Sequence, residues 1–268
     1  MANDSQKHVE TWLGKQGYPL EYRVARLLRA ESAGRPDGLK VEQGRHWQDV
    51  DPRTGRRTGR ELDVVATLAG DNAVVRVVVE CKHLVDPWVI FEHEDGALAT
   101  SWDETIELWM ASPPIRQIFG VWYSGGPLEI LKPPSGFKIL DTRFDQKAEP
   151  EKTSAFDAAM QLARGAWALH QSTPRGKSAL TLPVLVLEGD LFTVSYDSHG
   201  KERIDQVTQR RVTWSAAVLE GPKDSIRTWP IIITVVTASA LEGFVNELGP
   251  AVREMHGVLE AKLPERPA

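Results

Sequence analysis

Apolar residues recur at helical spacing between residues 19 and 32, in the stretch PLEYRVARLLRAES. One side of this segment carries Leu20, Val24, Leu27 and Leu28. The other side carries the arginines, and a proline is acceptable in the first turn of a helix. The pattern therefore predicts an amphipathic helix that packs its apolar side against a core.

Three strands are predicted directly after this helix. They cover residues 39–48, 61–68 and 73–82. The last of them is rich in valine, whose branched side chain suits a strand. Asp71 and Asn72 are acceptable in the primed turns of two-residue hairpin loops, so the second and third strands are expected to form a hairpin.

Residues 84–150 interrupt this regular pattern. Aromatic residues lie there among Pro- and Gly-rich breaks, namely Trp88, Phe91, Trp102, Trp109, Trp122 and Tyr123. We interpret this range as an insertion subdomain within a single domain that spans residues 1–268. The tryptophans either fill the core of that subdomain or bind bases or a partner.

Regular patterning resumes at residue 153. A helix is predicted over residues 153–171, followed by the strands LPVLVLEG, LFTVSYD, RRVTWSAAVL and WPIIITVV and by a last helix that starts near Ser239. PIIITVV is apolar on both faces, which is typical of a strand covered on both sides. The alternation of helices and strands predicts an α/β fold.

Composition narrows the functional classes. The chain of 268 residues has a net charge of −5 and one cysteine, Cys81, so neither an intrachain disulfide nor a zinc site made of cysteines is expected. No apolar run reaches the length of a bilayer, and MANDSQKHVE is not a signal peptide. We expect a soluble, cytoplasmic protein without a membrane partner.

Charged residues stand within the predicted hairpin. A loop at Asp71 and Asn72 would set Asp63 opposite Glu80, with Cβ atoms roughly 5 Å apart. Opposed carboxylates repel each other, so the arrangement calls for a cation. Lys82, on the same face as Glu80, is one candidate, and Mg²⁺ or Mn²⁺ with carboxylate oxygens as ligands is the other.

The predicted first helix contributes one more acid. Glu21 lies on the side of Val24, Ala25 and Leu28 and not on the arginine side, so it is able to approach the carboxylate pair. In chain order the pattern is an acid on a helix, Asp63 on a strand and, after 16 residues, Glu80-Cys81-Lys82 on the next strand.

This order resembles the PD-(D/E)xK, or restriction-endonuclease-like, nuclease superfamily. The matching residues are Glu21, Asp63, Glu80 and Lys82, within residues 19–83, and Leu62 stands where the motif has proline. The helix at 153–171 and the strand LPVLVLEG resemble the superfamily's later αβ unit. The resemblance implies an αβββαβ core with a mixed sheet, here with an aromatic-rich insertion and additional C-terminal strands and a helix.

The resemblance also implies an activity. Asp63, Glu80 and the backbone carbonyl of Cys81 would hold Mg²⁺ or Mn²⁺, and Glu21 would hold a water of the second shell or a second metal. Lys82 would orient or activate the attacking water. The implied function is that of a metal-dependent endonuclease acting on phosphodiester bonds, with DNA as the expected partner, for example in phage defence.

An arginine-rich segment, DPRTGRRTGR, precedes the Asp63 strand, and its Pro and Gly residues predict a turn. It contains Arg53, Arg56, Arg57 and Arg60. Residues 1–60 carry 12 Lys and Arg against 8 Asp and Glu, while the remainder of the chain is acidic. These arginines are predicted to bind nucleic acid; the alternative is a solvated loop.

Other interpretations stay open. One alternative to a metal site is a structural ion-pair cluster formed by Asp63, Glu80 and Lys82. The alternative for Glu21 is a surface acid at the start of a helix. His46 and Trp47 either approach the substrate or pack, and Cys81 is expected to be a buried small hydrophobe. The alternative function is a catalytically silent nuclease-fold subunit of a DNA-processing or phage-defence assembly. A homodimer and a complex with another subunit are both compatible with the sequence.

Overall fold

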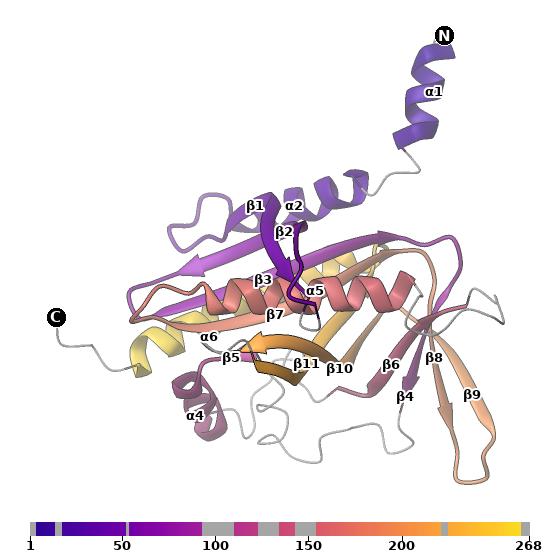
Figure 1. The fold of residues 1–268 in the computed structure, drawn as a ribbon. Coiled ribbons are helices and arrows are strands. Elements are labelled where there is room, and N and C mark those ends of the chain that lie inside the picture. The colour runs from indigo at the N-terminus through magenta and orange to yellow at the C-terminus, as the bar shows by residue number, and fades with distance from the viewer. Residues whose placement is uncertain are drawn as a thin grey trace.

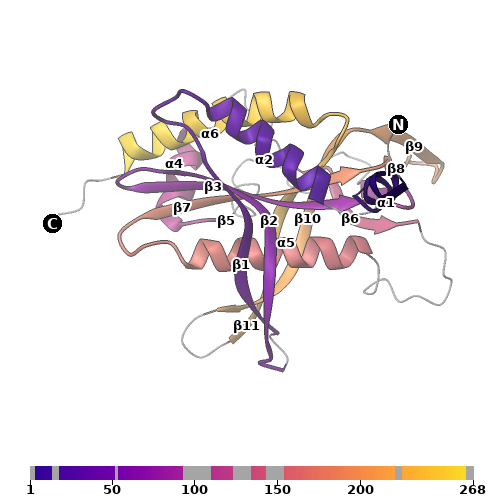
Figure 2. The same ribbon diagram turned by 90° about the horizontal axis from the view of Figure 1, so that it is seen from above.

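The computed structural model describes residues 4–13, 18–51, 54–92, 110–122, 134–142, 154–220 and 225–263. These residues form a mixed α/β fold with one large mixed sheet and helices on both of its faces (Figures 1 and 2). The helices are α1 (Asp4–Leu13), α2 (Tyr18–Ser32), α4 (Pro113–Trp122), α5 (Ser154–Gln171) and α6 (Leu241–Lys262).

The strands follow the order β1-β2-β3-β7-β11-β10-β6-β4-β8-β9 across the sheet, and β5 pairs with β7. Their bounds are β1 (Lys40–Val50), β2 (Arg57–Ala69), β3 (Ala73–His83), β4 (Trp88–Glu92), β5 (Met110–Ala111), β6 (Gly136–Asp141), β7 (Ser178–Glu188), β8 (Leu191–Tyr196), β9 (Glu202–Val207), β10 (Gln209–Glu220) and β11 (Ser225–Thr237). β1, β2 and β3 form an antiparallel meander, and β7 lies parallel to β3.

Two apolar cores lie on opposite faces of the sheet. Helices α2 and α6 cover one face and α5 covers the other (Figure 2). Along β3, Val77 and Val79 pack under α2 and α6, whereas Val78 packs under α5. Because β3 is buried on both faces, it reads in the sequence as a nearly continuous run of valines.

The β2–β3 hairpin has the predicted register. Val64 pairs with Val79, and the pairing continues to Ala69 and Val74. The Gly70 amide donates a hydrogen bond to the Ala73 carbonyl oxygen at 2.9 Å, which leaves Asp71 and Asn72 as the two-residue loop. The sequence-based prediction of this hairpin is therefore confirmed.

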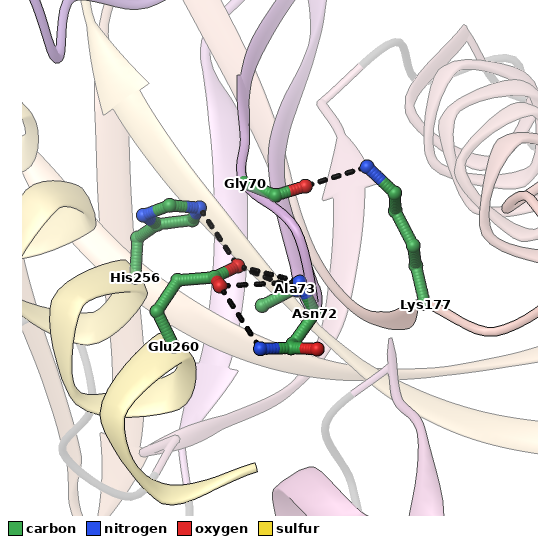
Figure 3. Close-up of polar contacts among 6 residues, drawn as sticks. All are labelled: Gly70, Asn72, Ala73, Lys177, His256 and Glu260. Atoms are coloured by element: carbon green, nitrogen blue, oxygen red, sulfur yellow. Dashed lines mark hydrogen bonds and ion pairs between the residues drawn. The ribbon is translucent and has the colours of Figure 1, made fainter. Parts of the chain in front are cut away.

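Contacts from distant parts of the chain hold this loop (Figure 3). The Glu260 carboxylate on α6 accepts hydrogen bonds from the backbone amides of Asn72 at 3.1 Å and Ala73 at 2.7 Å. Lys177 donates from Nζ to the Gly70 carbonyl oxygen at 2.5 Å. A Cβ atom at Gly70 would overlap a Glu260 carboxylate oxygen, so a side chain at this position would displace the carboxylate.

The strands described within residues 84–150 belong to the main sheet, and α4 lies in the same range. β4 and β6 pair with each other, and β6 also pairs with β10. Trp88 is buried in the core under α5. Trp102, Trp109 and Tyr123 lie outside the described residues, and the division of the chain into a domain and an insertion stays a prediction.

Six elements were not predicted from the sequence, namely the helices α1 and α4 and the strands β4, β5, β6 and β9. The predicted turn at residues 53–60 is wrong in its second half, because β2 already begins at Arg57. Within the described ranges, no helix has both the length and the apolar character needed to cross a membrane.

Candidate functional site

Strands β2 and β3 part at the position of Asp63 and Glu80. Their pairing ends at Val64 and Val79, although both strands continue. Beyond this point β2 stays paired with β1 and β3 stays paired with β7. Figure 2 shows the β1–β2 hairpin leaving the plane of the sheet. We call this opening the β2–β3 fork, and Asp63 and Glu80 are its first residues.

A glycine opposite Asp63 accompanies the fork. Gly44 has a φ of 70°, in the left-handed region that glycine adopts without strain. The β1–β2 pairing is continuous in register on both sides of Gly44 and Asp63 but omits these two residues. Leu62 packs under α5 while Val64 packs under α2 and α6, so the strict alternation of faces breaks at Asp63.

Asp63 is half-buried and binds the neighbouring strand through its side chain. Its Oδ2 accepts a hydrogen bond from the Cys81 amide at 2.6 Å. The carboxylate thus satisfies a backbone donor at the fork, where the β2 backbone no longer pairs with β3. Burial raises the pKa of Asp63, and the hydrogen bond from Cys81 and the charge of Lys82 oppose that rise.

Glu80 is the most buried charged group of the fork, with 1 % of its surface exposed. Its Oε1 accepts a hydrogen bond from Lys82 Nζ at 2.7 Å, whereas Oε2 has no hydrogen-bond partner among the described residues. Burial, reinforced by the charge of Asp63, raises the pKa of Glu80 to about 7. A buried carboxylate oxygen without a donor calls for a proton, a water molecule or a cation.

Lys82 remains a cation in this arrangement. Burial by itself would lower the pKa of Lys82, but the charge of Glu80 and the hydrogen bond to it outweigh burial, and the pKa is raised. A lysine with a raised pKa does not accept a proton near neutral pH. Lys82 therefore acts here through its positive charge.

Glu21 on α2 lies within electrostatic reach of the fork, as predicted. Burial, followed by the charges of Asp63 and Glu61, raises the pKa of Glu21 to about 7. Glu21 comes from the α2 face of the sheet, and its charge also raises the pKa of Glu80. The structure thus brings Glu21, Asp63, Glu80 and Lys82 into one electrostatically coupled group.

The fork offers the oxygen ligands that a hard cation prefers, but few side chains provide them. In the part of the chain that the structure describes, no three acidic, histidine or cysteine side chains converge to hold a metal ion. Asp63, Glu80 and a backbone carbonyl would supply three oxygens, which suits Mg²⁺ with retained waters. The free Oε2 of Glu80 favours such a cation, and the bond of Lys82 to Oε1 opposes it.

Cys81 faces the opposite side from Glu80 and packs in the core under α2 and α6. Burial raises the pKa of its thiol well above the ordinary range. Cys81 is thus a buried small hydrophobe, as predicted, and its thiol is not an activated nucleophile.

The predicted nucleic-acid-binding arginines have different surroundings. Arg53 lies outside the described residues. Arg56 and Arg57 are exposed near the tip of the β1–β2 hairpin. Arg60 lies with its Nε 3.1 Å from Oδ2 of the buried Asp49, so its guanidinium already has an anionic partner.

The sequence did not reveal that α5 contacts β1 and β2. Arg164 Nη1 lies 3.5 Å from Asp49 Oδ2, and Gln161 Nε2 donates to the Glu61 carbonyl oxygen at 3.1 Å. His46 is exposed, and Trp47 packs against the core under α5. Because α5 is about 100 residues away along the chain, no local pattern connects it with β1 and β2.

Comparisons with protein-family models, with curated proteins and with solved structures produced no match to this chain.

Proposed function

We propose that this chain is a metal-dependent nuclease that hydrolyses phosphodiester bonds, with DNA as the expected substrate. The observation that carries the proposal is the β2–β3 fork, which gathers Asp63, Glu80 and Lys82 and leaves one oxygen of a buried carboxylate without a donor. The ion pair with Lys82 satisfies only Oε1 of Glu80. A cation bound through Oε2 would satisfy the second oxygen.

The order of the elements also supports a restriction-endonuclease-like core. The helix α2 is followed by β1, β2 and β3, and later by α5 and β7. In space β7 lies next to β3 and parallel to it. This sequence of elements is compatible with the αβββαβ arrangement that the resemblance implies.

Each residue of the fork has a proposed role. Asp63 and Glu80, with the Cys81 carbonyl, would hold a divalent cation, and such a cation would polarise the scissile phosphate. Lys82 would stabilise the charge that develops on the phosphate. Glu21 would position a water molecule at the edge of the site. Because a carboxylate must be ionised to hold a cation, the site is expected to bind Mg²⁺ more tightly above about pH 7.

A second candidate is a catalytically silent nuclease-fold subunit that binds nucleic acid within a larger assembly. The Lys82–Glu80 ion pair and the lack of a third side-chain ligand within the described ranges favour it. In this case Lys82 would replace the cation permanently. The two candidates differ in a single property, which is cleavage by the purified chain.

The test is cleavage of plasmid, single-stranded DNA and RNA with Mg²⁺, with Mn²⁺ and with EDTA. Asp63→Ala, Glu80→Ala and Lys82→Ala are each expected to abolish cleavage, because each removes a ligand or the lysine charge. Glu21→Ala is expected to lower the rate by a smaller factor. Melting curves establish that the variants are folded.

Glu247→Ala is the matched control, because Glu247 is an exposed acid on α6 outside the fork. It is expected to cleave at close to the wild-type rate. Full activity in any one of the three alanine variants would contradict the assigned roles. A folded wild-type chain that cleaves none of the substrates with either metal would favour the silent subunit.

A further inference from the structure

One face of α2 carries two tyrosines and two arginines. Successive residues of a helix are about 100° apart, so Tyr18, Tyr22, Arg26 and Arg29 fall within about a quarter of its circumference. All four side chains are exposed, with 60 % of Tyr18 and 61 % of Tyr22 accessible to solvent. We call this face the α2 stripe.

The fold itself does not account for the α2 stripe. The apolar contacts of α2 with the core are made by other positions of the helix, which include Val24, Ala25 and Leu28. Neither Arg26 nor Arg29 has a carboxylate partner among the described residues. Glu31, the acid near the end of the helix, is paired with Arg253 of α6 at 2.6 Å. The α2 stripe is therefore aromatic and positively charged. Its two arginines have no ion-pair partner in the described part of the chain.

The stripe begins beside the proposed site. Glu21, which is coupled to Asp63, lies one residue before Tyr22 and three after Tyr18, so it borders the stripe on the helix surface. The two tyrosines are about 6 Å apart along the helix axis, from four residues at about 1.5 Å each. This spacing is wider than the roughly 3.4 Å between neighbouring bases of a duplex strand, so the rings suit bases that are unstacked.

We propose that the α2 stripe binds a single strand of nucleic acid that leads into the β2–β3 fork. Tyr18 and Tyr22 stack with unpaired bases, and Arg26 and Arg29 bind phosphates. Charge complementarity identifies the partner, because exposed aromatic rings interleaved with unpaired cations match the bases and phosphates of a single strand. This inference rests on the proposed nuclease function of the fork.

The experiment measures binding of the full chain to a fluorescent oligonucleotide in EDTA, so that cleavage does not interfere. A 12-nucleotide single strand and the matching duplex are compared across salt concentrations. Tyr18→Ala and Tyr22→Ala are each expected to weaken single-strand binding roughly 5- to 100-fold. Tyr18→Phe and Tyr22→Phe are expected to retain it, since the ring stacks without its hydroxyl.

The arginines are tested through the salt dependence. Arg26→Ser with Arg29→Ser is expected to lower the log–log slope for the single strand by about 1.4, because each phosphate bound on a single strand contributes about 0.7. A matched double variant, Arg175→Ser with Lys201→Ser, removes two exposed cations elsewhere on the molecule and is expected to leave the slope unchanged. Melting curves establish that all variants are folded.

The outcomes separate the inference from the function on which it rests. Unchanged single-strand affinity in the alanine variants would overturn the α2 stripe as a binding surface, even if the wild type cleaves. Equal decreases in affinity for duplex and single strand would overturn the preference for unpaired bases. Binding that depends on the stripe, together with no cleavage under any metal condition, would support the surface and refute the nuclease.

Discussion

Glu80→Gln tests the nature of the fork without knowledge of the substrate. Glutamine has nearly the shape of glutamate but does not ionise, so this substitution removes the charge from the most buried carboxylate of the site. With EDTA present, the wild type carries that charge at pH 8 at the cost of burying it beside Asp63. The variant does not, and we expect it to be the more stable protein at this pH.

The magnitude follows from the pKa of Glu80, which burial raises from 4.5 to about 7. The folded state then holds its proton more tightly than the unfolded state. The resulting stabilisation is complete below about pH 4.5 and disappears as the pH rises through 7. A difference of this size corresponds to about 3 kcal/mol in the free energy of unfolding, at about 1.4 kcal/mol per pH unit.

The assay is urea unfolding of wild type and Glu80→Gln at pH 5 and pH 8 in EDTA. We expect the free energy of unfolding of the wild type to fall by up to about 3 kcal/mol more than that of the variant between the two pH values. Asp63 and Glu21 also have raised pKa values, so a smaller pH dependence is expected to persist in Glu80→Gln.

Metal provides the second arm of the experiment. Mg²⁺ at ten times its dissociation constant is expected to stabilise the wild type at pH 8 by about 1.4 kcal/mol, a rise of about 3–6 °C in melting temperature, and to leave Glu80→Gln unaffected.

A structural ion pair predicts the opposite, because Lys82 would be left without its partner in the variant. A Glu80→Gln protein that is less stable than wild type at pH 8 in EDTA, with a wild type indifferent to Mg²⁺ and Mn²⁺, would refute the metal site.

Two further substitutions test other parts of the molecule. Serine in place of Arg53, Arg56 and Arg57 together is expected to weaken DNA binding and to lower the log–log salt slope by about 0.9 for each phosphate of duplex DNA that these arginines neutralise; an unchanged slope would identify a solvated hairpin tip. Glu260→Ala is expected to lower the free energy of unfolding in urea by about 1–3 kcal/mol, because it removes the acceptor of two backbone amides in the β2–β3 loop. Glu254→Ala removes an exposed acid from the same helix and serves as its control, and equal destabilisation by the two substitutions would contradict this explanation.

Local patterns in the sequence were sufficient for the main elements around the site. The helix predicted at residues 19–32 is observed as Tyr18–Ser32, and the one predicted at 153–171 as Ser154–Gln171. The register of the β2–β3 hairpin was also predictable, because a two-residue loop determines the pairing of every later residue. Periodicity and turn chemistry depend on near neighbours in the chain, and the sequence displays them directly.

The short elements were harder to predict from the sequence. α4 and β9 were not predicted, and the strands β4 and β6 were interpreted as part of an irregular insertion. The strands among these segments have neighbours in the sheet, which are β10 for β6 and β8 for both β4 and β9. Pairing between strands that are far apart in the chain, as for β6 with β10 and β4 with β8, leaves little trace in the hydrophobic pattern of either strand. β9 follows β8 directly, but it is mostly exposed and so lacks an apolar alternation.

For the candidate site too, some features were predictable from the sequence and others were decided by the tertiary structure. Spacing alone indicated that Asp63 and Glu80 would oppose each other and that Lys82 would share a face with Glu80. Only the tertiary structure decided that β2 leaves β3 at this point, opposite the left-handed Gly44, and that the Cys81 amide binds Asp63 while Lys82 binds Glu80. The burial that raises the pKa of Glu80 depends on tertiary packing around β3, in which Glu80 pairs with Leu185 of β7, about 100 residues later in the chain. Side-chain order along a strand is a local property, whereas burial and the allocation of hydrogen-bond donors depend on which distant segments pack together.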